Sequence, residues 1–231
     1  RGEAPENTLG GFQYIHDLGI RAVEFDVRQL KDDALIVMHD DNFLRTTGID
    51  QKLYQLDSTQ FEAYNQANIW MDWEKQVTPT LRQSLNIMHD FDHLEVEVKA
   101  VDTQVQAEKL IAELQQQLRG FEHTAVITSF DLKIHHALIL QNTHFKHGLL
   151  IENDIGEKAI EQAIELQCCQ IGWMNQLATD EIIKTTQKAG LAVSVWTVND
   201  IERAKHLRNL KIDGLITDFP KMMQIALEQI K

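Results

Sequence analysis

The chain has 231 residues, of which 43% are hydrophobic and 25% are charged, and its formal net charge is −13. The length can bury a large core, and the composition is typical of a globular protein. The negative charge argues against sequence-independent binding to nucleic acid and against docking on an anionic membrane surface. No apolar run reaches the about 18 residues that cross a bilayer, so no membrane insertion is expected.

The first half of the chain predicts a helix, a hairpin and an insertion. Apolar residues recur at helical spacing over 9–18, between a cap at Thr8 and a stop at Gly19. Residues 21–30 and 34–40 then predict an antiparallel hairpin. An inserted region follows at roughly 43–80, so that hairpin and insertion together occupy a region near residues 31–80.

From residue 94 onward, strands and helices alternate. Strands are predicted at 94–100, 124–130, 147–152, 169–174, 191–198 and 214–219, and helices at 102–120, 131–142, 157–167, 179–190, 199–210 and 220–231. Such alternation predicts a parallel sheet covered by helices, either an open sheet or a closed barrel. No G-x-G-x-x-G or Walker loop follows a strand, so nucleotide-binding open sheets lose support.

Polar side chains at the carboxyl ends of the predicted strands favour the barrel. They are Asp26, His39, Lys99, Asn199 and Asp218. A (β/α)8 TIM barrel builds its active site at this end of its strands. No Pro-, Gly- or Ser-rich linker divides the chain, so residues 1–231 are predicted to form a single domain.

The barrel is one strand short if the arm at 34–40 is an accessory. The sequence supplies seven barrel strands, and its first helix has no strand before it. We therefore expect a short apolar strand of ~4–6 residues upstream of Arg1.

Two strands carry carboxylates on one face. Glu24 and Asp26 are two residues apart, as are Glu95, Glu97 and Lys99, and residues at this spacing point the same way. The helix-facing side of a barrel must be apolar, so these charges should point inward. A single acidic pair in a strand is commonly a solvated edge. Two such strands together instead favour a divalent ion with oxygen ligands, Mg²⁺ or Ca²⁺, because buried carboxylates would otherwise repel one another.

The histidines and cysteines are predicted to have different roles. His39 ends a strand beside Asp40 and could carry a proton at neutral pH. His89 and His93 have helical metal-site spacing, but their segment is too polar for a zinc site to be expected. The remaining candidates are predicted to be surface, packing or rim residues: His135, His136, His144, His147, Cys168 and Cys169. The two cysteines are adjacent and form no disulfide framework, and no secretory signal is present, so a reducing compartment, the cytoplasm, is expected.

Several motifs together resemble the glycerophosphodiester phosphodiesterase family. The family opens with H-R-G and A-P-E-N-T, and "RGEAPENT" at 1–8 matches all but the first histidine. The family's E-x-D is matched at 24–26, its H-D and R-T-T within 39–47, its P-T-L at 79–81 and its E-x-K at 97–99. "VWTVN" at 195–199 and "GLITDFP" at 214–220 complete the series. Arg82 departs from the acidic residue that often follows P-T-L.

The resemblance implies metal-dependent hydrolysis of a glycerophosphodiester to glycerol 3-phosphate and an alcohol. It assigns the metal to Glu24, Asp26 and Glu97, one of two catalytic histidines to His39, and phosphate contacts to Arg1 and Lys99. Trp196 would line the substrate end. The supporting positions around these residues would be Glu6, Asp40 and Phe130. The second histidine is expected directly before Arg1.

Two alternatives stay open. The same barrel could act on a lipid, as a lysophospholipase D-like hydrolase, although the insertion is polar apart from Trp70, Met71 and Trp73. It could instead be a non-catalytic binding barrel that lacks the first histidine. The expected partner is a small phosphodiester, and the sequence gives no indication of the oligomeric state, of the alcohol or of the ion.

Overall fold

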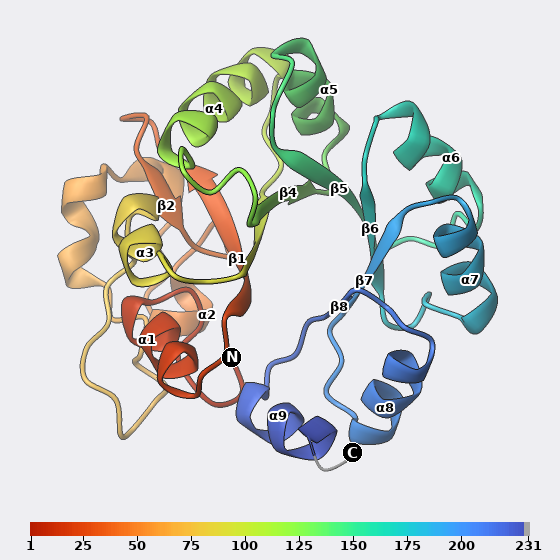
Figure 1. Cartoon of the computed structure of the whole chain (residues 1–231). Helices are drawn as coiled ribbons and strands as arrows, with labels where there is room; N and C mark the ends of the chain where they lie inside the picture. The colour runs from red at the N-terminus through yellow and green to blue at the C-terminus, as the bar shows by residue number, and fades with distance from the viewer. Residues whose placement is uncertain (229–231) are drawn as a thin grey trace.

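The computed structural model describes residues 1–228 and consists of a curled sheet surrounded by helices (Figure 1). The eight strands follow the order β2-β1-β3-β4-β5-β6-β7-β8, and all neighbours are parallel except the antiparallel pair β1 and β2. Their bounds are β1 (Ala22–Gln29), β2 (Leu35–Val37), β3 (His93–Val98), β4 (Ala125–Ser129), β5 (Lys146–Ile151), β6 (Gln170–Met174), β7 (Ala192–Trp196) and β8 (Gly214–Leu215). The predicted barrel of parallel strands with an accessory antiparallel arm is confirmed.

The helices lie outside the strands and cover them (Figure 1). They are α1 (Leu9–Asp17), α2 (Leu44–Thr47), α3 (Leu81–Ile87), α4 (Gln104–Gln117), α5 (Leu132–Leu140), α6 (Lys158–Glu165), α7 (Asp180–Lys188), α8 (Ile201–Asn209) and α9 (Pro220–Glu228), with 3-10 turns η1 (Leu53–Gln55) and η2 (Ser58–Ala63). None of the helices in residues 1–228 has the length and apolar character needed to cross a bilayer. The last part of the predicted helix 220–231, residues 229–231, lies outside the described residues.

The structure differs from the predictions at one strand and at one helix. The strand predicted over 34–40 ends at Val37, after which His39 and Asp40 turn toward each other and form a side-chain hydrogen bond. No helix is predicted between the insertion and the strand at 94–100, whereas the structure has α3 there. Thr80 and Gln83 form a capping box there, in which each side chain accepts a hydrogen bond from the other residue's backbone N–H. The T-x-x-Q spacing is typical of a helix start, so it could have predicted α3.

The register of β1 and β3 fixes which side chains meet. Glu24 pairs with Glu95, and Asp26 pairs with Glu97. On the opposite face, Phe25 and Val27 pack with Val96, Val98 and the buried faces of α3 and α4 in one hydrophobic core. Because the helix-facing side is apolar, both carboxylate pairs point into the barrel, as predicted.

The two ends of the sheet are not paired with each other within the described residues. β1 pairs with β2 and β3, and β8 pairs with β7. Between β1 and β8 lies the N-terminal segment, where the backbone N–H of Gly2 donates to the carbonyl of Asp218 at 3.0 Å. The strand expected before Arg1 stays a prediction.

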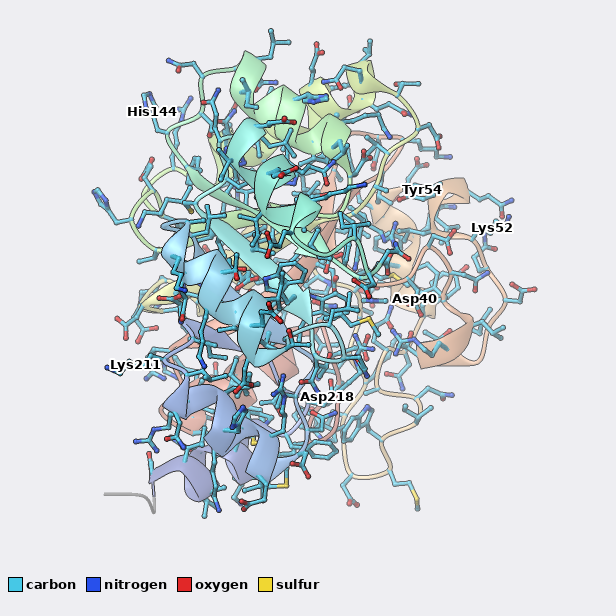
Figure 2. All side chains as sticks on the ribbon, turned by 90° about the vertical axis from the view of Figure 1, so that its right-hand side faces the viewer. Asp40, Lys52, Tyr54, His144, Lys211 and Asp218 are labelled. Carbon is cyan, nitrogen blue, oxygen red and sulfur yellow. The ribbon has the colours of Figure 1, made fainter. Side chains whose placement is uncertain are left out.

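The insertion has a small core of its own. Phe43, Leu53, Leu56 and Phe61 are buried together with residues from both arms of the hairpin. Figure 2 shows this segment, with Lys52 and Tyr54, projecting on the side where Asp40 lies, whereas His144 and Lys211, which precede β5 and β8, lie on the opposite side. The insertion therefore stands at the carboxyl end of the barrel strands, where the candidate active site is expected.

Candidate active site

Three carboxylates from two neighbouring strands meet inside the barrel. Glu24 and Asp26 come from β1 and Glu97 comes from β3. One oxygen from each lies within 4.8 Å of the others, and Asp26 and Glu97 are buried. The structure thus brings together the three residues that the sequence assigned to a metal.

The carboxylates of this cluster repel one another, and a bound cation would relieve that repulsion. Burial, followed by repulsion from Asp26 and Glu97, raises the pKa of Glu24 well above its usual value. Burial, followed by repulsion from Asp26, raises the pKa of Glu97 to about 7. Glu24 Oε1 is buried and has no hydrogen-bond partner. Buried, mutually repelling oxygen donors of this kind suit Mg²⁺ or Ca²⁺, so the residues present fit the divalent ion that the sequence predicts.

Lys99 partly neutralises the cluster. Its ammonium group lies 2.6 Å from Asp26 Oδ1 and also contacts Glu97 Oε1, and the side chain is 12% exposed. Burial opposes the charge of Lys99, but attraction from Asp26 and Glu97 outweighs it, so the pKa of Lys99 is raised. Lys99 therefore stays charged at the edge of the carboxylates, where an anionic substrate group could meet it.

Asn7 orients Asp26, a contact that the sequence analysis did not identify. The side-chain amide of Asn7 donates to Asp26 Oδ2 at 2.7 Å, and its carbonyl oxygen accepts the backbone N–H of Asp26 at 3.3 Å. Asn7 holds this position with φ at 53°, a left-handed conformation that asparagine tolerates better than most residues. The A-P-E-N-T motif contained this residue, but its spacing did not reveal the contact.

His39 belongs to a second group of charges next to the carboxylates. Its Nδ1 lies 2.6 Å from Asp40 Oδ1, while Arg45 Nε donates to Asp40 Oδ2 at 2.6 Å. Arg45 also donates two hydrogen bonds to Glu6. Glu6 and Asn7 line both the small recess that holds His39 and the cavity that holds Glu24 and Asp26. Arg45 was not predicted to take part, although it lies in the R-T-T motif.

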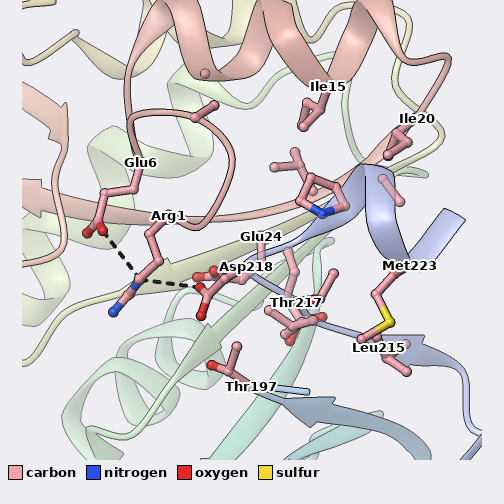
Figure 3. A pocket seen from close by; sticks show the side chains of 18 of the residues that line it. Arg1, Glu6, Ile15, Ile20, Glu24, Thr197, Leu215, Thr217, Asp218 and Met223 are labelled. Atoms are coloured by element: carbon pink, nitrogen blue, oxygen red, sulfur yellow. Dashed lines mark ion pairs between the residues drawn. The ribbon is translucent and has the colours of Figure 1, made fainter. Parts of the chain in front are cut away.

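Arg1 lies on the wall of the main cavity rather than in the carboxylate cluster. This cavity of about 560 Å³ lies between β1 and β8, and Figure 3 shows Arg1 between Glu6 and Asp218. Arg1 Nε lies 3.3 Å from Glu6 Oε2 and 3.5 Å from Asp218 Oδ1. The inner part of the cavity is strongly acidic, since it also includes Glu24, Asp26 and Glu95.

Trp196, at the end of β7, and Phe130, directly after β4, pack on each other although two strands separate β4 from β7 in the sheet. Their rings are 5.5 Å apart and nearly perpendicular, and the indole N–H of Trp196 donates to the carbonyl of Gly172. Neither residue lines the main cavity. The role of Trp196 at the substrate end and the supporting role of Phe130 stay predictions.

Glu95 provides an internal contrast to the carboxylate cluster. It lies on the same inward face as Glu97, but it accepts a hydrogen bond from Ser194 at 3.1 Å, and Gln170 in turn donates to Ser194. Glu95 is therefore bound by a neutral hydroxyl donor from β7, which is itself held by Gln170 from β6. It is not one of the three residues that meet.

We expect Arg45→Gln to reduce stability in a pH-dependent way. Burial raises the pKa of Glu6 and of Asp40, but hydrogen bonds from Arg45 outweigh it and hold both below their usual values. Stability from these pairs is present above the unfolded carboxyl pKa of about 4 and is lost as the pH falls through the lower folded values. Because Arg45 is 44% exposed, screening limits the loss at pH 7 to a Tm decrease of roughly 2–4 °C.

Thermal unfolding of the wild type and of Arg45→Gln from pH 3 to 8 measures this effect. The difference in Tm should vanish near the acidic end. Arg82→Gln, at an exposed position on α3, is the matched control. An equal Tm difference at all pH values would contradict the electrostatic account.

Known proteins match this chain over nearly its whole length. The glycerophosphoryl diester phosphodiesterase family matches residues 1–222. A glycerophosphodiester phosphodiesterase of Caldanaerobacter subterraneus is 25% identical over 223 residues, which cover 95% of this chain and 90% of that protein. A human lysophospholipase D is 33% identical over only 63 residues, 27% of this chain and 20% of that protein.

The fold is shared with solved structures. The phosphodiesterase of Oleispira antarctica, solved with its product sn-glycerol-3-phosphate, aligns with a TM-score of 0.88 and 23% identity over 98% of this chain and 93% of that one. The barrel predicted from the sequence is thereby confirmed. With the family match extending over residues 1–222, the resemblance noted in the sequence motifs is also confirmed. The chain belongs to the glycerophosphoryl diester phosphodiesterase family.

Proposed function

We propose that the chain is a metal-dependent glycerophosphodiesterase that releases glycerol 3-phosphate and an alcohol from a small phosphodiester, and that its barrel acts as a single domain in the cytoplasm. The proposal rests on the close approach of the carboxylate oxygens of Glu24, Asp26 and Glu97. The family match supports the reaction class. The cytoplasmic location is supported by the two free cysteines.

Glu24, Asp26 and Glu97 would hold one divalent ion, Mg²⁺ or Ca²⁺. When bound, this ion would neutralise the phosphodiester anion and stabilise the negative charge that develops in the transition state. Lys99 already lies against Asp26 and Glu97, and Arg1 lies on the cavity wall, so either cation could contact the phosphate. These local charges would offset the repulsion between the substrate and a chain of net charge −13.

His39 is suited to transfer a proton. Asp40 accepts a hydrogen bond from Nδ1 of His39, which fixes the ring and leaves Nε2 as the nitrogen that exchanges a proton with the substrate. Arg45 holds Asp40 in place and is itself held by Glu6. His39 would take the proton of the attacking hydroxyl, from water or from the substrate's glycerol 2-hydroxyl, or protonate the leaving alkoxide. The histidine expected before Arg1 would make the other transfer.

A lysophospholipase D-like activity is the second candidate, and one observation favours it. In the insertion, Ile69 is 67% exposed and Met71 is fully exposed. Exposed apolar side chains on a loop can contact lipid tails or a micelle surface. The apolar part of the main cavity is not assigned to a lipid tail, because the cavity lies between β1 and β8 and no residue of the insertion lines it.

A product assay separates these functions. The protein would be incubated with glycerophosphocholine or with lysophosphatidylcholine in the presence of Mg²⁺ or Ca²⁺. We expect glycerol 3-phosphate from the first and little lysophosphatidic acid from the second. The reverse result would establish the lipid activity, whereas binding of glycerol 3-phosphate without turnover of either substrate would indicate a non-catalytic binding barrel.

A further inference from the structure

A second group of potential metal ligands lies outside the candidate active site. His135 comes from α5, His147 from β5, and Cys168 precedes β6. Their exposed fractions are 0%, 6% and 7%. Cys168 belongs to the same hydrophobic core as Leu149 on β5, and Leu138 on α5 belongs to the other large core. The sequence predicted surface, packing or rim roles here, and nothing in the proposed reaction uses these side chains.

The three donor atoms form a compact triangle. His135 Nδ1 and His147 Nδ1 are 3.2 Å apart, and Cys168 Sγ lies 3.7 Å from the first and 3.6 Å from the second. A tetrahedral zinc ion with its usual bond lengths separates two nitrogen ligands by about 3.3 Å and a nitrogen from a sulfur ligand by about 3.6 Å. The spacing of the side chains therefore already matches the ligand spacing around such an ion.

The orientation of His135 shows which of its atoms is available. His135 Nε2 lies 3.1 Å from the carbonyl oxygen of Ser129, which can only accept, so Nε2 carries the proton and Nδ1 carries the lone pair. A ligand histidine whose other nitrogen donates to a backbone carbonyl is the usual arrangement at metal sites.

Hydrogen bonds within this cluster cannot use the lone pairs of all three atoms at once. If His147 Nδ1 is protonated, it and the thiol of Cys168 are two donors facing the single lone pair on His135 Nδ1. If His147 Nδ1 is unprotonated, it and His135 Nδ1 are two acceptors 3.2 Å apart with only the weak thiol donor between them. A cation accepts all three lone pairs at once. Thiolate and imidazole ligands select zinc and related transition metals rather than Mg²⁺ or Ca²⁺.

We propose that His135 Nδ1, His147 Nδ1 and Cys168 Sγ bind one transition-metal ion of the zinc type. Binding forms two metal–nitrogen bonds and one metal–sulfur bond, and the thiol proton of Cys168 leaves to solvent. Among the described residues no fourth side chain joins the triangle, so water would complete a tetrahedral site. The ion would tie α5 to β5 and to the start of β6, and it would stabilise the folded chain by binding the native state.

Cobalt(II) is the probe that distinguishes this site from the carboxylates, because only a cysteine ligand gives a thiolate-to-cobalt charge-transfer absorption. The metal-free protein would be titrated with Co²⁺ and then with Zn²⁺ under reducing conditions. We expect the charge-transfer band and tetrahedral visible bands to saturate at one equivalent, and Zn²⁺ to displace the cobalt. We also expect Zn²⁺ to raise the Tm.

Matched variants identify the ligands. Cys168→Ser should abolish the charge-transfer band, whereas Cys169→Ser, a neighbouring thiol outside the triangle, should keep it. Glu97→Gln should also keep the band, because Glu97 belongs to the other cluster. The variant therefore separates a failure of the proposed reaction from a failure of this metal site. The proposal is wrong if the wild type gives no charge-transfer band with excess Co²⁺, or if Cys169→Ser rather than Cys168→Ser removes the band. The wild-type titration tests it even where a variant does not fold.

Discussion

Glu97→Gln is expected to lower kcat/KM by about 10²–10³-fold or more, the usual cost of losing one strong electrostatic contact to a transition state. The change removes one charge from the three oxygens that meet and leaves the shape of the side chain almost unaltered. Because Glu97 has a pKa raised to about 7 by burial and by Asp26, the protein without metal should not be destabilised by the substitution. The loss should therefore appear in activity and in affinity for Mg²⁺ or Ca²⁺, not in the Tm.

Glu95→Gln is the matched control for this prediction. Glu95 lies two residues away on the same strand and the same inward face, but it accepts a hydrogen bond from Ser194 and is not one of the three that meet. Its substitution should leave the affinity for the divalent ion within a few-fold of the wild type. Equal loss of ion affinity in both variants would show that the cavity attracts cations only through its overall charge. Isothermal titration and steady-state kinetics measure the two quantities.

His39→Ala should lower turnover by about 10²–10⁴-fold, the contribution typical of a positioned proton carrier. The Tm should change little, because the His39 side chain is 38% exposed and its main contact is with Asp40. Asp40 would keep its partner Arg45 in the variant. Steady-state kinetics and thermal unfolding of the same preparations check the prediction.

His93→Ala is a suitable comparison for His39→Ala. His93 begins β3, at the opposite end of the strand from Lys99, and its side chain is 42% exposed. Its removal should leave turnover nearly unchanged. If His39→Ala lost activity and thermal stability in parallel, His39 would have a packing role instead of a proton-transfer role.

The inward carboxylates could be predicted because strand geometry alone fixes them. Glu24 and Asp26 in one strand and Glu95 and Glu97 in the other alternate with apolar residues. The choice of Glu24, Asp26 and Glu97 as the metal set came from the family resemblance, and the structure brings these three together. The alternation of strands and helices predicted a parallel sheet covered by helices, and the polar residues at the strand ends favoured its closure into a barrel. Both inferences depend on periodic patterns that local sequence contains.

The supporting contacts could not be predicted, because they join segments that are distant in sequence. Arg45 meets Glu6 across 39 positions, and Asn7 meets Asp26 across 19. His135 and Cys168, 33 positions apart, meet only because α5 packs against the sheet beside the start of β6. No spacing rule connects such pairs. Their motifs marked the segments, but only the fold shows which side chains touch.

Removal and return of the divalent ion test the central claim most directly. Release of glycerol 3-phosphate from a soluble glycerophosphodiester would be measured before chelation, after chelation and dialysis, and after addition of Mg²⁺ or Ca²⁺. Activity should fall to background after chelation and return with the ion in the wild type, while Glu97→Gln should stay near background throughout. Full activity of the wild type in excess chelator would contradict the proposal that Glu24, Asp26 and Glu97 act by holding a metal.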